Sequence, residues 1–169
     1  MIVAATGHRP DKLGGYARST WLATVGHART ILSIIEPCGV ISGMALGWDQ
    51  AVARAGLDLG IPVIAAIPFI GQADRWPRVA RDQYFRLMSE ATAKVKVWEQ
   101  PGYETENVRD ALMSRNRWMV DNCGLVIALW DGSTGGTGAC VSYARSVGRE
   151  VLNGWGGFDH YRDSGEWLI

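Results

Sequence analysis

The sequence has few cysteines, and they form no motif. Cys38, Cys123 and Cys140 stand far apart and make no CxxC pair, so a structural zinc site is not expected, and the sparse thiols are typical of reduced cysteines. Long hydrophobic runs are also missing, since a membrane helix needs ~20 apolar residues, and the N-terminus shows no signal-peptide pattern. We therefore expect a cytoplasmic protein with no membrane partner and no metal.

Charge of neither sign is in excess. Lys plus Arg and Asp plus Glu both number 17, so the chain lacks the overall attraction that holds nucleic acids or anionic membranes, and nucleic-acid binding is disfavoured unless a local basic cleft exists. Apolar residues make up 47% and charged residues 20%, which is typical of a globular protein. The 169 residues predict one domain that buries roughly 70% of the unfolded surface.

Short apolar runs alternate with segments of helical periodicity. Strands are predicted at 2–5, 39–42, 61–69, 93–98, 124–130 and 151–152, and helices at 21–35, 49–59, 78–92, 105–122 and 136–147. This alternation indicates an α/β, three-layer fold, in which helices cover both faces of a mostly parallel sheet of five or six strands. Residues 1–152 form the domain. The glycine- and aromatic-rich tail, 153–169, has no usable period and is expected to pack on it.

Candidate functional residues follow four of the predicted strands. In parallel sheets ligands bind beyond the carboxyl ends of the strands, where the strand order reverses. The candidates at these ends are Thr6, Gly7, His8 and Arg9, then Gly43, Gly47 and Asp49, then Phe69 and Gln72, and finally Asp131, Thr134, Gly135, Gly136, Thr137 and Gly138. Their convergence at one edge is the main indication of a ligand site.

The glycine-rich loop before the last predicted helix is the strongest single signal. Gly135, Gly136 and Gly138 let backbone N–H groups approach an anion, and the helix start adds its positive dipole end. The hydroxyls of Thr134 and Thr137 are further donors. We interpret the loop as a phosphate site. The alternative is a glycine-rich turn with a helix cap, because the spacing matches neither GxGxxG nor a P-loop.

The other candidates each have a structural alternative. Asp49 accepts from ribose hydroxyls or caps the helix that follows. Arg9 pairs with a phosphate and His8 exchanges a proton, or both lie in a surface turn. Phe69 and Gln72 offer a stacking face and an amide to a base, or Phe69 is core.

Tryptophans, one arginine and one thiol add weaker signals. Trp48, Trp76 and Trp130 fall near strand ends, where they either line a pocket or pack in the core. Arg115 belongs to the helix predicted before the fifth strand. The alternative is that it lies on an ordinary, solvated face of that helix. Cys140 follows the glycine loop, and we expect it to be buried rather than a reactive thiolate.

These motifs resemble the YpsA-like branch of the SLOG superfamily, which also includes the DprA (Smf) proteins and the Lonely Guy phosphoribohydrolases. The resemblance rests on TGHRP at 6–10, SGMALGWD at 42–49 and IPF at 67–69 with Gln72, and it runs from residue 1 to about 152. It implies a Rossmann-like fold, a nucleotide or nucleotide-derived ligand, no further cofactor, and a homo-oligomer.

Lonely Guy enzymes cleave the N-glycosidic bond of a nucleoside monophosphate, and their signature is an arginine followed by PGGxGTxxE. Arg115 falls at the place of that arginine, and the glycines of 135–138 match three positions of the motif. Ala139 stands at the threonine position and Ser142 at that of the glutamate. A serine does not stabilise an oxocarbenium charge as a carboxylate does, so the resemblance does not carry the mechanism over intact.

Three functions follow from the sequence. The first is nucleotide binding with hydrolysis or transfer at an N-glycosidic bond, with Asp49, Arg115 and Asp131 as candidate catalytic residues. The second is a non-catalytic nucleotide sensor or regulator, which Ser142 favours. The third, disfavoured by the neutral net charge, is single-stranded DNA binding as in DprA.

Overall fold

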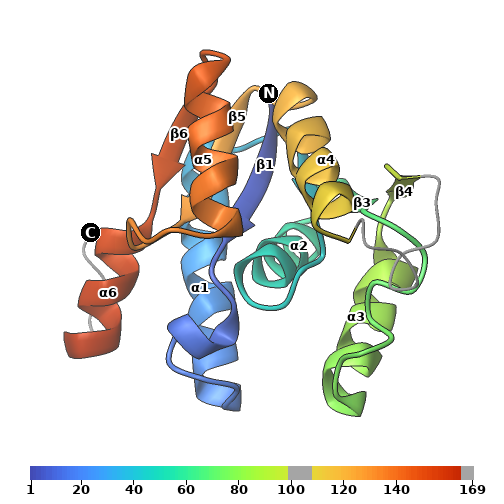
Figure 1. The fold of residues 1–169 in the computed structure, drawn as a ribbon. Coiled ribbons are helices and arrows are strands. Elements are labelled where there is room, and N and C mark those ends of the chain that lie inside the picture. Colours follow the sequence, from blue (N-terminus) through green and yellow to red (C-terminus); the bar gives the residue numbers. More distant parts are fainter. Residues whose placement is uncertain (99–107, 165–169) are drawn as a thin grey trace.

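The computed structural model describes residues 1–98 and 108–164 (Figure 1). The strands are β1 (Ile2–Gly7), β2 (Gly39–Ser42), β3 (Val63–Ile67), β4 (Ala93–Lys96), β5 (Leu125–Leu129) and β6 (Glu150–Asn153). The helices are α1 (Arg18–Ile35), α2 (Trp48–Asp58), α3 (Arg78–Glu90), α4 (Val108–Asp121), α5 (Gly136–Ser146) and α6 (Trp155–Ser164), with a 3-10 turn η1 (Pro10–Lys12). Among these helices none combines the length and apolar character that crossing a bilayer requires.

The six strands form one parallel sheet in the order β4-β3-β2-β1-β5-β6. This confirms the predicted α/β, Rossmann-like three-layer fold. The chain builds outward from β1 to β4, then crosses back through α4 to place β5 on the other side of β1. The strand order therefore reverses between β1 and β5, and a crevice is expected at their carboxyl ends. Figure 1 shows α3 and β4 at one side of the molecule and α6 and β6 at the other.

Two apolar cores lie on the two faces of the sheet. Alternate residues of β1 point to opposite faces, so Val3 joins one core and Ala4 the other. The first core contains residues of α1, α2, α3 and α6, including Leu32 and Phe158. The second contains residues of α4 and α5, including Met119. Burial on both faces explains the nearly continuous apolar strands in the sequence.

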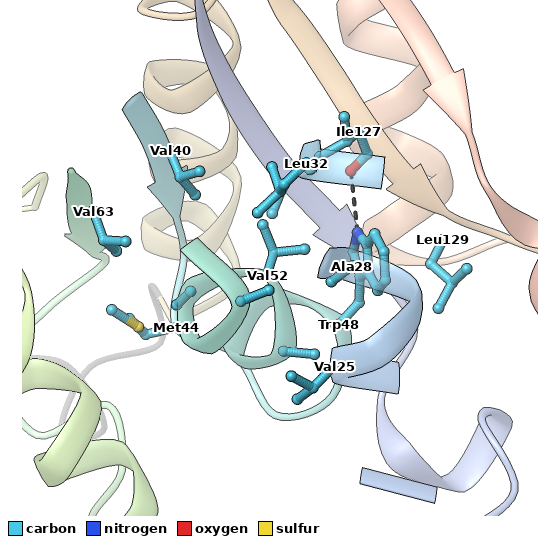
Figure 2. Packing of buried hydrophobic residues seen from close by; sticks show 14 of the residues in the cluster. Val25, Ala28, Leu32, Val40, Met44, Trp48, Val52, Val63, Ile127 and Leu129 are labelled. Carbon is cyan, nitrogen blue, oxygen red and sulfur yellow. Dashed lines mark hydrogen bonds between the residues drawn. The ribbon is translucent and has the colours of Figure 1, made fainter. Parts of the chain in front are cut away.

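Trp48 fixes the position of α2 against the sheet. Its side chain is fully buried, and its indole Nε1 donates a hydrogen bond of 3.2 Å to the carbonyl of Ile127 (Figure 2). A Cβ atom at Gly7 would lie 2.5 Å from Trp48, so only glycine lets the end of β1 approach this ring. Trp48 is thus a core residue and not part of a pocket wall, and it places the start of α2 beside the end of β1.

Element boundaries differ from the prediction where local chemistry intervenes. The third strand, predicted at 61–69, is confined to Val63–Ile67 because Pro62 and Pro68 flank it and cannot donate to the ladder. The start of the helix predicted at 105–122 lies outside the described residues. The tail shows no usable period in the sequence, yet it forms α6, with Phe158 only 1% exposed. Gly156 and Gly157 hide this helix from a periodicity analysis.

Candidate ligand-binding site

A cavity of about 420 Å³ opens at the carboxyl ends of β1, β2, β3 and β5. It brings together most of the residues singled out from the sequence: Thr6, Gly7, His8, Arg9, Asp49, Phe69, Gln72, Arg115, Thr134, Gly135, Gly136, Thr137 and Gly138. Because β1 and β5 are neighbours, the loop after β1 faces the glycine loop after β5 across the cavity. The cavity therefore lies at the point where the strand order reverses, as the fold predicts.

The glycine loop lines the cavity at the start of α5, where the backbone of Gly135 and Gly136 is not covered by side chains. Gly135 occupies the N-cap position with a φ of 139°, and no side chain caps the helix. A Cβ at Gly135 or Gly136 would meet nothing within 4 Å, whereas one at Gly138 would lie 2.9 Å from the carbonyl of Ser133. Gly135 itself stands at the cap position, and no side-chain oxygen takes the place of a ligand at the start of the helix. The first N–H groups of α5 remain for a ligand or water.

Arg115 is buried in the cavity wall and does not lie on a solvated helix face. The residue is 4% exposed. Its Nη1 donates a hydrogen bond to the carbonyl of Gly43, and its Nε donates one of 2.9 Å to Asn116 Oδ1. Burial lowers the pKa of Arg115, and the nearby Asp49 carboxylate opposes that shift. A guanidinium held this way is a preorganised partner for an anion.

Gly43 and Gly47 do not line this cavity. A Cβ at Gly43 would collide with the guanidinium of Arg115, so this glycine makes room for the arginine. Gly47 has a φ of 94°, and a Cβ there would collide with the carbonyl of His8. Gly47 lines a separate, mainly apolar hollow beside α1 and α3. Both glycines therefore shape the neighbours of the cavity.

Asp49 lies in the first turn of α2 and is 5% exposed. The N-cap position belongs to Gly47, so the predicted alternative of Asp49 as the helix cap is wrong. Burial raises the pKa of Asp49 to about 6, against the lowering effect of Arg115, whose Nη1 lies 3.9 Å from Asp49 Oδ2. A carboxyl that changes its protonation near neutral pH suits general acid or base work.

Asp131 does not line the cavity. It connects the two rims of the cavity, the loop after β1 and the loop after β5, by hydrogen bonds. Its Oδ1 lies 2.7 Å from His8 Nε2 and accepts the backbone N–H of Ser133 at 2.9 Å. Its Oδ2 lies 3.3 Å from Lys12 Nζ, which also donates to the hydroxyl of Ser133. Hydrogen bonds from Ser133 and His8 hold the pKa of Asp131 below its usual range, so the group stays an ionised carboxylate.

Lys12 and Ser133 line the cavity, yet sequence reasoning did not single them out as site residues. Their signal was position: Lys12 stands two residues after TGHRP, and Ser133 stands two residues before Gly135. Trp130 supports this rim, because its Nε1 donates to the carbonyl of Ser133 at 2.7 Å. The expectation for Cys140 is confirmed, since it is 3% exposed and burial raises its pKa to about 11.

Together, the parallel sheet and the glycine-lined cavity at its switch point define the class of the chain, an α/β protein with a Rossmann-like fold. More narrowly, the chain belongs to the DNA recombination-mediator protein A family, whose model matches residues 23–166. A curated relative is an uncharacterized SPbeta prophage-derived protein, YoqJ, of Bacillus subtilis (strain 168). It is 30% identical over 118 residues, which cover 63% of this chain and 69% of YoqJ.

Solved structures of low sequence identity share the fold. DNA processing protein A of Streptococcus pneumoniae is 22% identical with a TM-score of 0.58, and the match covers 99% of this chain but 57% of that protein. DNA processing protein A of Helicobacter pylori, whose structure was reported for its single-stranded DNA binding mode, is 16% identical with a TM-score of 0.59. The match covers 99% of this chain and 74% of that protein. The molybdenum cofactor carrier protein of Chlamydomonas reinhardtii is 13% identical with a TM-score of 0.56, covering 97% and 85%.

Proposed function

We propose that the protein binds a nucleotide or a nucleotide derivative in the cavity at the start of α5. The observation that carries this proposal is the pairing of an uncapped, glycine-lined helix start with the buried guanidinium of Arg115 in one cavity. Backbone N–H groups, a helix dipole and a cation of fixed position are the features that bind a phosphate. Arg9, Thr6 and Thr137 add donors around the same space.

The apparent stability of the protein tests this proposal. Nucleoside mono-, di- and triphosphates, cyclic nucleotides, NAD and ADP-ribose are each added and the thermal midpoint is measured. A ligand at 100 times its dissociation constant stabilises by about 2.7 kcal/mol, which raises the midpoint by about 5–10 °C in a chain of this size. A panel in which no nucleotide raises the midpoint contradicts the proposal.

Cleavage or transfer at an N-glycosidic bond is a second candidate, which Asp49 favours. It is a cavity carboxyl with a pKa of about 6, and Arg115 stands beside it. Ser142, which takes the place of the expected glutamate, is exposed and outside the cavity lining. Asp49 is therefore the acid we assign to the reaction.

Product analysis separates this enzyme from a sensor. Chromatography of the stabilised samples is expected to show free base, and Asp49→Asn is expected to lower its rate of release by about 100-fold or more, as loss of an acid–base group does. Asp49→Glu is the matched control that keeps a carboxyl. An intact ligand, bound together with a change of oligomeric state, contradicts turnover and supports a sensor that acts through self-association.

Single-stranded DNA binding is favoured by the family and by the fold shared with DNA processing protein A. The neutral chain opposes it, since backbone binding of DNA needs clustered cations. An oligothymidylate titration at two salt concentrations separates the two ligands. Affinity that falls steeply with salt and is unaffected by mononucleotide supports DNA as the ligand.

A further inference from the structure

Part of the cavity lining is apolar, and we call this part the slot. It is lined by Trp76, from the segment between β3 and α3, and by Val108 and Leu112 of α4. Val108 and Leu112 are four residues apart, so they share one face of the helix, and Asn116 continues that face. The amide of Gln72 also lines the slot. The slot thus has apolar walls and amide side chains at its edges.

The strand that leads to Trp76 and Gln72 and the strand that leads to the glycine loop are separated across the sheet. The slot follows β3 and the loop follows β5, and the order β3-β2-β1-β5 leaves three strand spacings between them. At roughly 4.8 Å per spacing, the two strand ends are about 14 Å apart. A phosphate at the start of α5 is too small to occupy the slot as well. The slot is therefore available to a second, flat and apolar part of the same ligand.

Trp76 has the exposure and support that stacking requires. It is half-buried, and its ring meets Tyr84 edge-on, with centroids 5.5 Å apart and an interplanar angle of 83°. Tyr84 is itself 5% exposed, so it holds the tryptophan from the protein side. Phe69, the stacking residue expected from the sequence, is only 1% exposed and offers little surface to a ligand. Trp76 is the larger and more accessible ring.

We propose that Trp76 is the base-stacking residue of this cavity, and that the ligand is a nucleotide with its base in the slot and its phosphate at the start of α5. This inference rests on the proposed nucleotide function. Stacking of a base on an aromatic side chain tolerates any base, because every base has a π-face. Asn116 also lines the cavity, and since its Oδ1 accepts from Arg115 Nε, its amide Nδ2 is the group that we expect to contact the edge of the base.

The affinities of nucleotides and of ribose 5-phosphate, compared between the wild-type protein and a variant, test the stacking role. Dissociation constants of adenosine 5′-monophosphate, the other three nucleoside monophosphates and ribose 5-phosphate are measured by calorimetry for the wild-type protein and Trp76→Ala. Trp76→Ala is expected to lower the affinity for the most tightly bound nucleotide by about 5- to 150-fold. It is expected to change the affinity for ribose 5-phosphate by less than about twofold. Phe85→Ala is the matched control, since Phe85 also contacts Tyr84 but lies outside the cavity.

Two conservative variants separate stacking from space filling. Trp76→Phe keeps a π-face and is expected to retain most of the nucleotide affinity, whereas Trp76→Leu keeps apolar volume and is expected to behave like Trp76→Ala. Base stacking is also expected to quench tryptophan fluorescence in the wild-type protein, and this quenching is expected to disappear in Trp76→Phe although the nucleotide still binds.

The outcomes distinguish this inference from the proposed function. If the wild-type protein binds ribose 5-phosphate and nucleotides equally well, the phosphate site stands and the base slot is refuted. Equal loss of both ligands in Trp76→Ala, with the same loss in Trp76→Phe, assigns Trp76 a structural role and overturns the inference. If no phosphate-bearing ligand binds to the wild-type protein, the proposed function itself fails.

Discussion

Replacing Arg115 with methionine is expected to weaken nucleotide binding by about 30- to 5,000-fold, because removal of one buried partner of a charged contact costs about 2–5 kcal/mol. The guanidinium is 4% exposed and is already oriented by Gly43 and Asn116. Little side-chain entropy is therefore lost when an anion arrives. Calorimetric titration at pH 7.5 measures the change, with Arg117→Met as the control. Arg117 is exposed on the same helix and lies over Tyr143, outside the cavity.

The same substitution is expected to increase the dependence of stability on pH. The pKa of Asp49 is about 6 in the folded protein against its ordinary value of 3.8, so the folded state holds the proton more tightly. The contribution of Asp49 to stability is then greatest at low pH and falls as pH rises from about 4 through the folded pKa. Loss of Arg115 removes a charge that lowers this pKa, so the fall between pH 5 and pH 8 becomes larger.

A double variant separates the two effects of Arg115. Arg115→Met together with Asp49→Asn is expected to remove the added pH dependence of the thermal midpoint, since the buried carboxyl is gone, but not to restore nucleotide affinity. If Arg115→Met binds nucleotide as tightly as the wild-type protein, the arginine serves the fold alone and the proposed phosphate site is wrong.

The fold was predictable because strand and helix signals are local. Buried parallel strands give short apolar runs, and their carboxyl ends meet at one edge whatever the strand order. The strand order itself is not local. Nothing in the sequence shows that β5 pairs with β1, and this pairing places Lys12 and Ser133 on facing rims of one cavity.

Individual site residues were harder to predict because similar residues take different roles. Arg115 and Arg117 are two positions apart on α4, and at 100° per residue they point about 200° apart, so one is buried in the cavity and the other exposed. Gly43 and Gly136 look alike in the sequence. The first makes room for a guanidinium and the second faces open space, and only tertiary contacts distinguish them.

Gly136→Asp is expected to weaken binding of a nucleotide phosphate by about 100-fold or more without harming the fold. Gly136 is the first residue of α5, and a Cβ there meets nothing within 4 Å, so the new side chain fits. The electrostatic repulsion between a carboxylate and a phosphate about 4 Å apart is roughly 4 kcal/mol at an effective dielectric constant of 20. The same carboxylate interacts favourably with the dipole of α5, so the thermal midpoint is expected to stay unchanged or rise.

Opposite signs for stability and binding make this substitution a stringent test of where the phosphate lies. Gly136→Asn has nearly the same size and no charge, so it measures any steric effect, and it is expected to bind within about tenfold of the wild-type protein. If both variants lose binding equally, the loop is sterically essential but its charge preference is unproven. If Gly136→Asp binds as the wild-type protein does, the phosphate does not lie at the start of α5. The buried Arg115 would then have to serve an anion placed elsewhere in the cavity.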